Sequence, residues 1–295
     1  MRLRSIGVLL VSVSLGAVSS FAQDAKLSAA TQQIEKRIAD SHADVAVAFR
    51  ALDAKIEWFY NADSSFHAAS TMKVPVMIEL FRQAKEGKLR LDDPLLVHNE
   101  FHSLVDGSPF QLDPADDSET DLYKAEGQTR MLNQLCELMI TVSSNLATNL
   151  LIQKLGVGTI GTTVHALGAD GMNVLRGVED NKAYERDLNN TTTAHALQIL
   201  LMAIAEGRAV DPASSRQMVE ILERQRFNEA IPAGLPPGTR VAHKTGELTK
   251  IHHDAAIVYA PRPFVLVILV RGMAEEKESS ALMAEITRAL YQATQ

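Results

Sequence analysis

The sequence predicts an α/β protein of the α+β type, in which both ends of the chain build one antiparallel sheet around an inserted helical domain. Two segments near the N-terminus, 44–50 and 55–61, alternate apolar and polar residues as half-buried strands do. Strand signals return near the C-terminus, at 239–245, 255–260 and 264–271. Most of the stretch between these two groups has the periodicity of amphipathic helices instead.

The first 22 of the 295 residues have the pattern of a secretory signal peptide. Arg2 and Arg4 give a positive start, residues 6–18 are largely apolar, and the triplet at 20–22 suits cleavage after Ala22. The apolar stretch is too short to favour a membrane span. We therefore expect a periplasmic or secreted protein that has no membrane segment once the signal is removed.

The composition restricts the class of partner. With 46% apolar residues the chain can bury a sizeable core. Loss of Arg2 and Arg4 leaves 27 basic against 36 acidic residues, a net charge of −9, and no basic patch stands out. These observations argue against nucleic acid as a partner. We expect a monomer that acts on a small molecule.

Helices and turns flank the predicted strands. An amphipathic helix is expected at 27–40, before the first strand. The break at Asp53-Ala54 makes the first two strands an antiparallel hairpin, and Pro261-Arg262-Pro263 separates the last two strands in the same way. A final helix is expected at 277–293, with apolar residues on one side.

The helical periodicity predicts five further helices, at 72–85, 129–141, 145–154, 191–205 and 212–223. The segments 92–121 and 168–190 have weak periodicity and are predicted as loops or short turns. Loops of this length within a compact domain are usually functional or mobile. The predicted domains are a sheet domain, 23–68 with 206–295, and a helical domain, 69–205.

Ser70 and Lys73 form the first candidate catalytic pair. Ser70 stands where a helix pattern begins, and Lys73 follows three residues later, on the same helix face. An amine at this spacing can reach the hydroxyl and activate it, and the unpaired amides of the helix start lie close by. From this pair alone, an N-cap role for Ser70 stays open.

Two further short motifs carry polar groups. Ser143-Ser144-Asn145 lies between two helix patterns, where a loop can aim a hydroxyl and an amide into a cleft; a helix N-cap is the alternative. Lys244-Thr245-Gly246 closes a predicted strand and offers a cation and a hydroxyl to a substrate carboxylate. Gly246 lets a ligand approach the backbone closely; a solvated strand end with a turn glycine is the alternative.

The three motifs occur in one order, each on the element that its chemistry requires. The set resembles that of the class A β-lactamases and related penicillin-binding proteins, which carry Ser-x-x-Lys, Ser-Asp-Asn and Lys-Thr-Gly. The resemblance covers nearly the whole mature chain. It implies the β-lactamase fold and an active-site serine hydrolase that needs no cofactor. The implied substrate is a β-lactam or a related acyl-D-alanine group.

The resemblance implies the roles in acylation. Ser70 is the nucleophile that forms the acyl-enzyme, Lys73 is the base or proton relay, and Ser143 passes a proton to the departing nitrogen. Lys73 serves as a base only if its pKa falls well below the usual value near 10.4. Burial and a neighbouring cation such as Lys244 lower this pKa, whereas a nearby carboxylate raises it.

The resemblance also implies the binding residues. Asn145 holds the substrate's side-chain amide, and Lys244 and Thr245 receive its carboxylate. The backbone amides of Ser70 and Glu247 form the oxyanion hole, in which one donor is typically worth two to three orders of magnitude in rate.

The carboxylate that activates water for deacylation is expected on a long loop before a run of threonines. Here Arg176 and Glu179 precede Thr191-Thr192-Thr193, which makes Glu179 the best candidate and Glu185 a second possibility. The proline and Leu-Asn that usually follow the glutamate in this family are absent, and the loop is shorter. A surface ion pair is the alternative role for Glu179.

Other positions also depart from the family pattern. Glu247 replaces a small neutral residue after Lys-Thr-Gly, and its carboxylate would oppose an anionic substrate if it points into the cleft. Ser144 replaces the usual aspartate, which mainly supports the loop. No arginine can be assigned to assist Lys244, and His253 is the only guess.

Two remaining features are predicted to be structural. Cys136 is the sole cysteine, so it forms no internal disulfide, and its apolar helical surroundings indicate a buried, inert thiol. His252-His253-Asp254 would be a poor metal site, because adjacent strand residues point to opposite faces.

The function predicted from the sequence is therefore hydrolysis of β-lactams with release of the acid. A D-alanyl-D-alanine peptidase or esterase on the same scaffold is the nearest rival. A non-hydrolytic penicillin-binding protein, which is acylated at Ser70 and stops there, is a rival from another class.

Overall fold

The computed structural model describes residues 15–295, with side chains from residue 25 onward. Most of the predicted signal segment therefore lies outside the described residues, and the predicted cleavage after Ala22 falls within helix α1 (Leu15–Ser41). This helix is longer than the predicted 27–40. In the described part of the chain, no helix combines the length and apolar character needed to cross a membrane.

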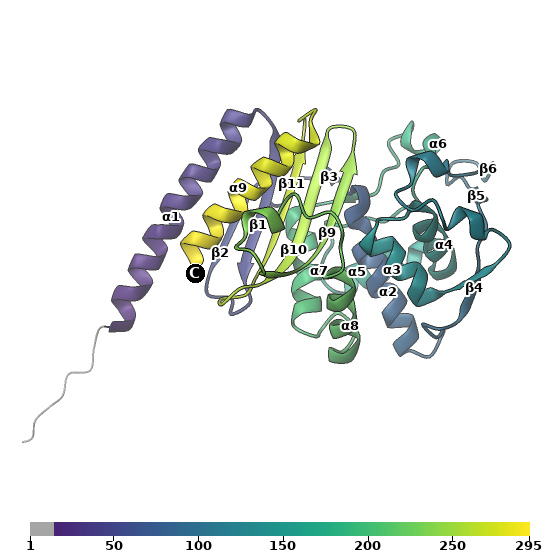
Figure 1. Ribbon diagram of the computed structural model, residues 1–295, viewed down its shortest axis with the longest axis horizontal. Coiled ribbons are helices and arrows are strands. Elements are labelled where there is room, and N and C mark those ends of the chain that lie inside the picture. Colours follow the sequence, from purple (N-terminus) through teal and green to yellow (C-terminus); the bar gives the residue numbers. More distant parts are fainter. Residues whose placement is uncertain (1–14) are drawn as a thin grey trace, which may run out of the picture.

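One five-stranded antiparallel sheet dominates one half of the molecule, in the order β2-β1-β11-β10-β9 (Figure 1). Its strands are β1 (Asp44–Ala51), β2 (Glu57–Tyr60), β9 (Arg240–Leu248), β10 (Ile251–Tyr259) and β11 (Phe264–Arg271). β1 pairs with β11 from Asp44 opposite Arg271 to Ala51 opposite Phe264. The two ends of the chain thus meet in one sheet, and the predicted fold class is confirmed.

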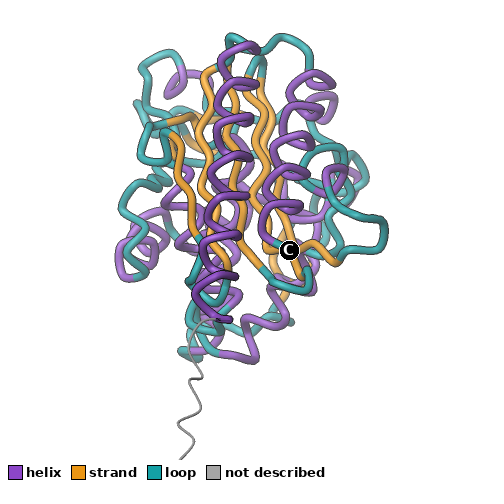
Figure 2. The backbone as a smooth tube through the Cα atoms, turned by 90° about the vertical axis from the view of Figure 1, so that its left-hand side faces the viewer, coloured by secondary structure: helices purple, strands orange, loops and turns teal. Residues whose placement is uncertain are grey.

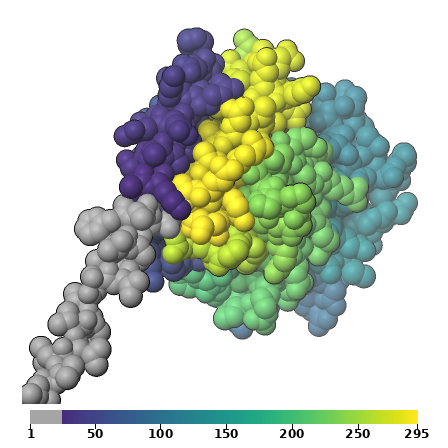
Figure 3. Space-filling model, turned by 60° about the vertical axis from the view of Figure 1, so that its left-hand side comes forward, coloured from purple at the N-terminus to yellow at the C-terminus, as the bar shows by residue number. Residues whose placement is uncertain are grey.

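Two helices cover one face of this sheet. α1 and α9 (Glu276–Thr294) lie side by side across it (Figures 2 and 3), and Arg37 of α1 forms an ion pair with Glu285 of α9. Apolar side chains fill the space between the helices and the strands; they include Ile34, Ile38, Val47, Phe49, Leu266, Ile268, Leu282, Ile286 and Leu290. This layer buries one whole face of the sheet that carries β9.

The other face of the sheet packs on the helical part of the chain. α7 (Ala194–Ala205) contacts β1, β10 and β11 directly. The remaining helices of this part are α2 (Lys73–Lys85), α3 (Leu132–Thr141), α4 (Asn145–Leu155), α5 (Val157–Ala166), α6 (Asn181–Tyr184) and α8 (Pro212–Leu222). Both sets of elements share one large apolar core, which runs from Ala46 and Ala48 of the sheet to Leu135 of α3. The exact domain boundaries stay a prediction.

Several element predictions needed correction. The helix α5 was missed, because its glycines and threonines have low helix propensity. Thr129–Met131 and Thr191–Thr192 are short strands rather than helix starts; they form β7 and β8 and pair with β4 (Pro94–Leu96) and β3 (Phe66–His67). The loop 92–121 also holds strands β5 (Phe101–His102) and β6 (Pro109–Phe110). Strands of two or three residues form because they pair with another segment of the fold, and local sequence patterns do not predict such pairing.

Candidate active site

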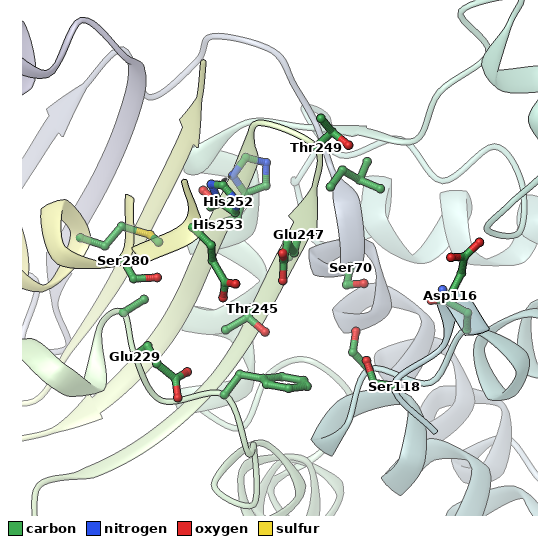
Figure 4. Close-up of a pocket in the computed structure, with 18 residues that line it drawn as sticks. Ser70, Asp116, Ser118, Glu229, Thr245, Glu247, Thr249, His252, His253 and Ser280 are labelled. Atoms are coloured by element: carbon green, nitrogen blue, oxygen red, sulfur yellow. Dashed lines mark hydrogen bonds between the residues drawn. The ribbon is translucent and has the colours of Figure 1, made fainter. Parts of the chain in front are cut away.

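A cavity of about 390 Å³ opens beside the edge strand β9, next to the 3-10 helix η1 (Ala69–Met72) (Figure 4). It is lined by six of the nine predicted site residues, namely Ser70, Ser143, Asn145, Thr245, Gly246 and Glu247. A second cavity of about 380 Å³ shares Ser70, Asn145 and Glu247 with the first and is also lined by Glu179. Lys73 and Lys244 are fully buried and bonded to residues of the same site.

Ser70 occupies the turn that leads into α2. η1 ends at Met72 and α2 begins at Lys73, so Ser70 precedes the α-helix rather than opening it. Among the described residues, no hydrogen bond holds its hydroxyl, which leaves the hydroxyl free for a reacting group. Gly246 explains how β9 comes so close, because a Cβ at that position would lie 3.2 Å from the Ser70 nitrogen. A side chain at this position would require η1 or β9 to shift by a few tenths of an ångström.

Lys73 is held by three oxygens in the interior. Its Nζ donates to the Ser143 carbonyl at 2.7 Å, to the Ser143 Oγ at 3.1 Å and to the Asn145 Oδ1 at 2.9 Å. Burial lowers the pKa of Lys73 to about 7, although the carboxylates of Asp117 and Glu179 act in the opposite direction. At neutral pH a large fraction of Lys73 is therefore uncharged and able to accept a proton.

Lys244 approaches the same hydroxyl from β9. Its Nζ donates to the Ser143 Oγ at 3.1 Å and to the Thr245 carbonyl at 2.9 Å. Burial lowers the pKa of Lys244 well below its usual value, and the charge of Lys73 lowers it further. Both lysines thus meet at one serine oxygen, which connects Lys73 on α2 to Lys244 on β9.

The turn between α3 and α4 positions the Ser143 hydroxyl, to which both lysines donate. Ser143 has a φ of +60°, a left-handed conformation that is uncommon outside glycine and that often occurs at functional sites. Ser144, not Ser143, is the N-cap of α4 and accepts a hydrogen bond from the Ala147 amide at 3.2 Å. The hydroxyl of Ser143 therefore remains available to the cavity.

Sequence reasoning missed Asp117, which supports this turn. Its buried carboxylate accepts hydrogen bonds from the Asn145 and Leu146 amides at 2.9 Å each, at the start of α4. It also accepts from the Tyr123 hydroxyl at 3.0 Å. A carboxylate is favoured at a helix N-terminus. Asp117 thus supplies, from a different segment, the negative charge that is absent at Ser144; nothing in its acid-rich loop sequence distinguished it.

Glu179 lies next to the reactive groups. Its Oε1 accepts a hydrogen bond from the Asn145 Nδ2 at 2.8 Å, and its φ is +62°. Burial raises the pKa of Glu179, and the hydrogen bond from Asn145 opposes this. The surface ion pair considered from the sequence is not formed among the described residues. Glu185 lies at the C-terminal end of α6 and is exposed, away from both cavities.

An amide side chain fixes the loop that carries Glu179. Asn149 of α4 accepts a hydrogen bond from the Val178 amide at 2.7 Å and donates one to the Val178 carbonyl at 3.0 Å. Gly177 makes this possible, because a Cβ there would lie 2.4 Å from the Asn149 Oδ1. No local sequence pattern indicates this pairing, since it joins two distant segments.

Thr245 and Glu247 project from β9 into the first cavity (Figure 4). Glu247 lies opposite His252 in the β9–β10 pair, so both share one sheet face. Burial raises the pKa of Glu247, the Glu276 carboxylate raises it further, and His252 opposes both. The carboxylate of Glu247 therefore does reach the region that was predicted to bind an anion.

The guess that His253 assists Lys244 is not supported by its contacts. Its Nε2 lies 2.9 Å from the His67 carbonyl, and its Nδ1 lies 2.8 Å from the His252 carbonyl and 3.2 Å from the Val270 nitrogen. Burial lowers the pKa of His253 to about 4. His253 is thus a neutral ring that ties β10 to its neighbours.

Cys136 is buried in α3, and burial raises the pKa of its thiol. An inert thiol follows from this environment. Within residues 15–295, no group of three or more His, Cys, Asp or Glu side chains is arranged to hold a metal ion.

A family model described as the beta-lactamase enzyme family matches residues 29–294. The chain belongs to this family. A curated beta-lactamase of Mycobacterium tuberculosis (strain ATCC 25618 / H37Rv) is 26% identical over 272 residues, covering 86% of this chain and 81% of that protein. The family supports hydrolase activity.

Solved structures of the family have the same fold. PBP-A superposes with a TM-score of 0.79 at 27% identity, over 90% of this chain and 96% of that one. An ancestral (GNCA) class A beta-lactamase superposes with a TM-score of 0.77 at 26% identity, over 90% of this chain and 99% of that one. The beta-lactamase from Sphaerobacter thermophilus DSM 20745 superposes with a TM-score of 0.76 at 26% identity, over 90% of this chain and 96% of that one. The chain is therefore a class A β-lactamase-like or penicillin-binding-protein-like member of the family.

Proposed function

We propose that this family member is a serine β-lactamase, which opens the β-lactam ring through an acyl-enzyme on Ser70 and releases the acid. One observation carries the proposal: an unbonded hydroxyl, a lysine with a pKa of about 7 and a carboxylate converge on one site, as Ser70, Lys73 and Glu179. With the predicted signal peptide, this reaction would take place in the periplasm or outside the cell.

Acylation uses the two lysines and two serines. The Ser70 Oγ forms a bond to the carbonyl carbon while uncharged Lys73 takes the hydroxyl proton. As the carbon–nitrogen bond breaks, the Ser143 hydroxyl gives its proton to the departing nitrogen and recovers one from Lys73, 3.1 Å away. Lys244, also 3.1 Å from that oxygen, stabilises the charge that develops on it.

The carbonyl oxygen develops negative charge during this step. β9 is the edge strand of the sheet, and it lies against η1 through the close contact at Gly246. We assign the backbone amides of Ser70 and Glu247 as the donors to this oxygen. Their rigid placement supplies stabilisation without reorganisation.

Deacylation needs a base that activates water. We assign this role to Glu179, which shares a cavity with Ser70 and whose carboxylate is oriented by the Asn145 side chain. Its raised pKa makes it a stronger base than an ordinary glutamate. Attack of the activated water on the ester carbon regenerates the Ser70 hydroxyl.

A non-hydrolytic penicillin-binding protein is the second candidate. Two observations favour it: the similarity to PBP-A, of which a mutant has been solved as an acyl-enzyme complex with penicillin G, and the absence of the usual residues after Glu179. In that case acylation of Ser70 would occur and release would not.

Turnover of a chromogenic cephalosporin separates the candidates. We expect continuous hydrolysis by the parent protein, and a burst of one equivalent would support the penicillin-binding alternative. Ser70→Ala should abolish both hydrolysis and the mass increase of the acyl-enzyme. A D-alanyl-D-alanine peptide assayed in parallel tests the peptidase alternative, which preferred cleavage of the peptide would support.

Glu179→Gln tests the deacylation step. We expect turnover to fall by about two to four orders of magnitude, the usual contribution of a positioned base, while acyl-enzyme accumulates in intact mass spectra. Glu185→Gln removes an exposed carboxylate a few residues away and should retain parental turnover. Equal turnover in Glu179→Gln and the parent would remove Glu179 from this role.

A further inference from the structure

The first cavity beside Ser70 has a strongly acidic lining. Among the described residues that line it are Asp116, Glu229, Glu247 and Glu276, and there is no lysine or arginine. Figure 4 shows Glu229 and Glu247 on the same side of the cavity as Thr245. Such a lining attracts cations and repels anions.

The two nearby ammonium groups do not offset this lining. Lys73 and Lys244 are fully buried, and their Nζ atoms already donate to three and two protein oxygens respectively. An anionic group in the cavity would therefore face several carboxylates, with only Lys244 close to the Thr245 side.

Glu247, Glu276 and His252 all line the first cavity, and the two glutamates are exposed. Glu247 faces His252 across the strand pair, and Glu276 stands in the first turn of α9. The two carboxylates are close enough for Glu276 to raise the pKa of Glu247. Two like charges held this close favour a cation between or beside them.

His252 gives an independent indication of a ligand. It lines the cavity, is only 5% exposed, and its Nδ1 is buried without a hydrogen-bond partner. A buried polar atom without a partner is costly in a native structure and asks for an explanation. In the neutral ring, one nitrogen accepts a hydrogen bond, and an ammonium or guanidinium N–H is a suitable donor.

We infer that the departing half of the preferred substrate carries an organic cation, bound by Glu247, Glu276 and Glu229 with His252 beneath them. The inference rests on the proposed function, because Ser143 donates to the departing nitrogen and so places that half of the substrate in this cavity. The acyl half, by contrast, lies toward Glu179. The substrate class is thus a cyclic or open acyl amide whose amine portion has a cationic substituent.

Two cephalosporins with the same thienylacetyl side chain test this inference. Cephaloridine carries a cationic pyridinium group at C3, whereas cephalothin carries a neutral acetoxy group there. We expect the ratio of their kcat/KM values, cephaloridine over cephalothin, to fall about two- to fivefold in Glu247→Gln and about tenfold in Glu247→Gln/Glu276→Gln, the range for partly exposed charge pairs. Added salt at 0.5 M should lower the parental ratio more than that of the double variant, in which only Glu229 and Asp116 keep their charge.

Glu278→Gln is the matched control, since Glu278 lies in the same helix turn as Glu276 but does not line the cavity. It should keep the parental ratio, and equal melting temperatures would show that the variants are folded. An unchanged ratio in the double variant, or the same fall in Glu278→Gln, would overturn the inference while the proposed function stands. If neither cephalosporin is hydrolysed and neither adds mass at Ser70 in Glu179→Gln, the proposed function fails and the inference falls with it.

Discussion

Two buried ammonium groups share one serine oxygen in this molecule. Lys73 and Lys244 each lie 3.1 Å from the Ser143 Oγ, and each is fully buried. Carboxylates stand on the other side of Lys73, where Asp117 and Glu179 raise its pKa against the larger effect of burial. The protonation of this lysine is therefore balanced near neutrality, where a base is most useful.

The pH dependence of acylation should report this balance. The pKa of Lys73 is about 7, and only the uncharged amine accepts the Ser70 proton. We therefore expect kcat/KM to rise with pH through about 7 and to fall about tenfold per unit below it. A profile from pH 5 to 9, measured with the chromogenic cephalosporin, checks this.

Glu179→Gln tests the cause of that pKa. Removing the carboxylate removes an effect that raises the pKa of Lys73, so the rising limb of the acylation profile should move to lower pH. Acylation rates are measured for this variant by mass spectrometry in single turnover. A flat profile in the parent, or a shift to higher pH in the variant, would contradict the assignment of Lys73.

At the scale of elements, the start of α4 depends on a carboxylate from another segment. Asp117 accepts hydrogen bonds from two amides of the first turn, and that turn carries Ser143 and Asn145. We expect Asp117→Ala to lower the free energy of unfolding by about 2–3 kcal/mol, because it leaves buried donors without partners. Urea unfolding measures this, and acylation should slow as well because the turn loses its support.

Asp116→Ala is the matched control for stability. Asp116 is the neighbouring aspartate, is exposed, and accepts no hydrogen bond from α4. Its replacement should change the free energy of unfolding by less than about 0.5 kcal/mol. Equal losses in the two variants would show that Asp117 has no special part in holding the turn.

Site residues that stand next to regular helices and strands could be predicted from the sequence. Ser70, Lys73, Ser143 and Lys244 stand in short motifs beside strong periodic patterns, and the structure brings all four to one site. Asp117 could not be found in this way, because it lies in an irregular loop and meets α4 only through the tertiary fold. Short-range patterns report local structure, whereas contacts between distant loops leave no such pattern.

Strand β10 begins four residues earlier than predicted, at Ile251 instead of 255. β10 was predicted from 255 onward because His252, His253 and Asp254 interrupt its apolar pattern. In the fold these polar side chains are buried, and the Asp254 carboxylate is satisfied by the Ile231 amide and by His243. A buried polar residue with partners is invisible to a hydrophobic pattern.

At the scale of the whole molecule, the layer of α1 and α9 packs on the sheet that carries β9, and only the start of α9 reaches the first cavity. Leu290 of α9 is fully buried against the sheet. Leu290→Ala should lower the free energy of unfolding by about 2–5 kcal/mol through the loss of apolar contacts and the cavity left behind. Urea unfolding checks this, and kcat/KM of the folded variant should stay near that of the parent.

Leu96→Ala provides the contrast, because Leu96 is 51% exposed on β4. Its removal should cost less than about 0.5 kcal/mol. A loss of activity in folded Leu290→Ala without a loss of stability would show that this layer acts on the site directly.

Because β1 is bordered by β11, the first strand to be synthesised lacks its main partner until Arg271 has left the ribosome. The β1–β2 hairpin alone is too small to be stable in water. Completion of this sheet is therefore postponed until nearly the whole chain has been synthesised.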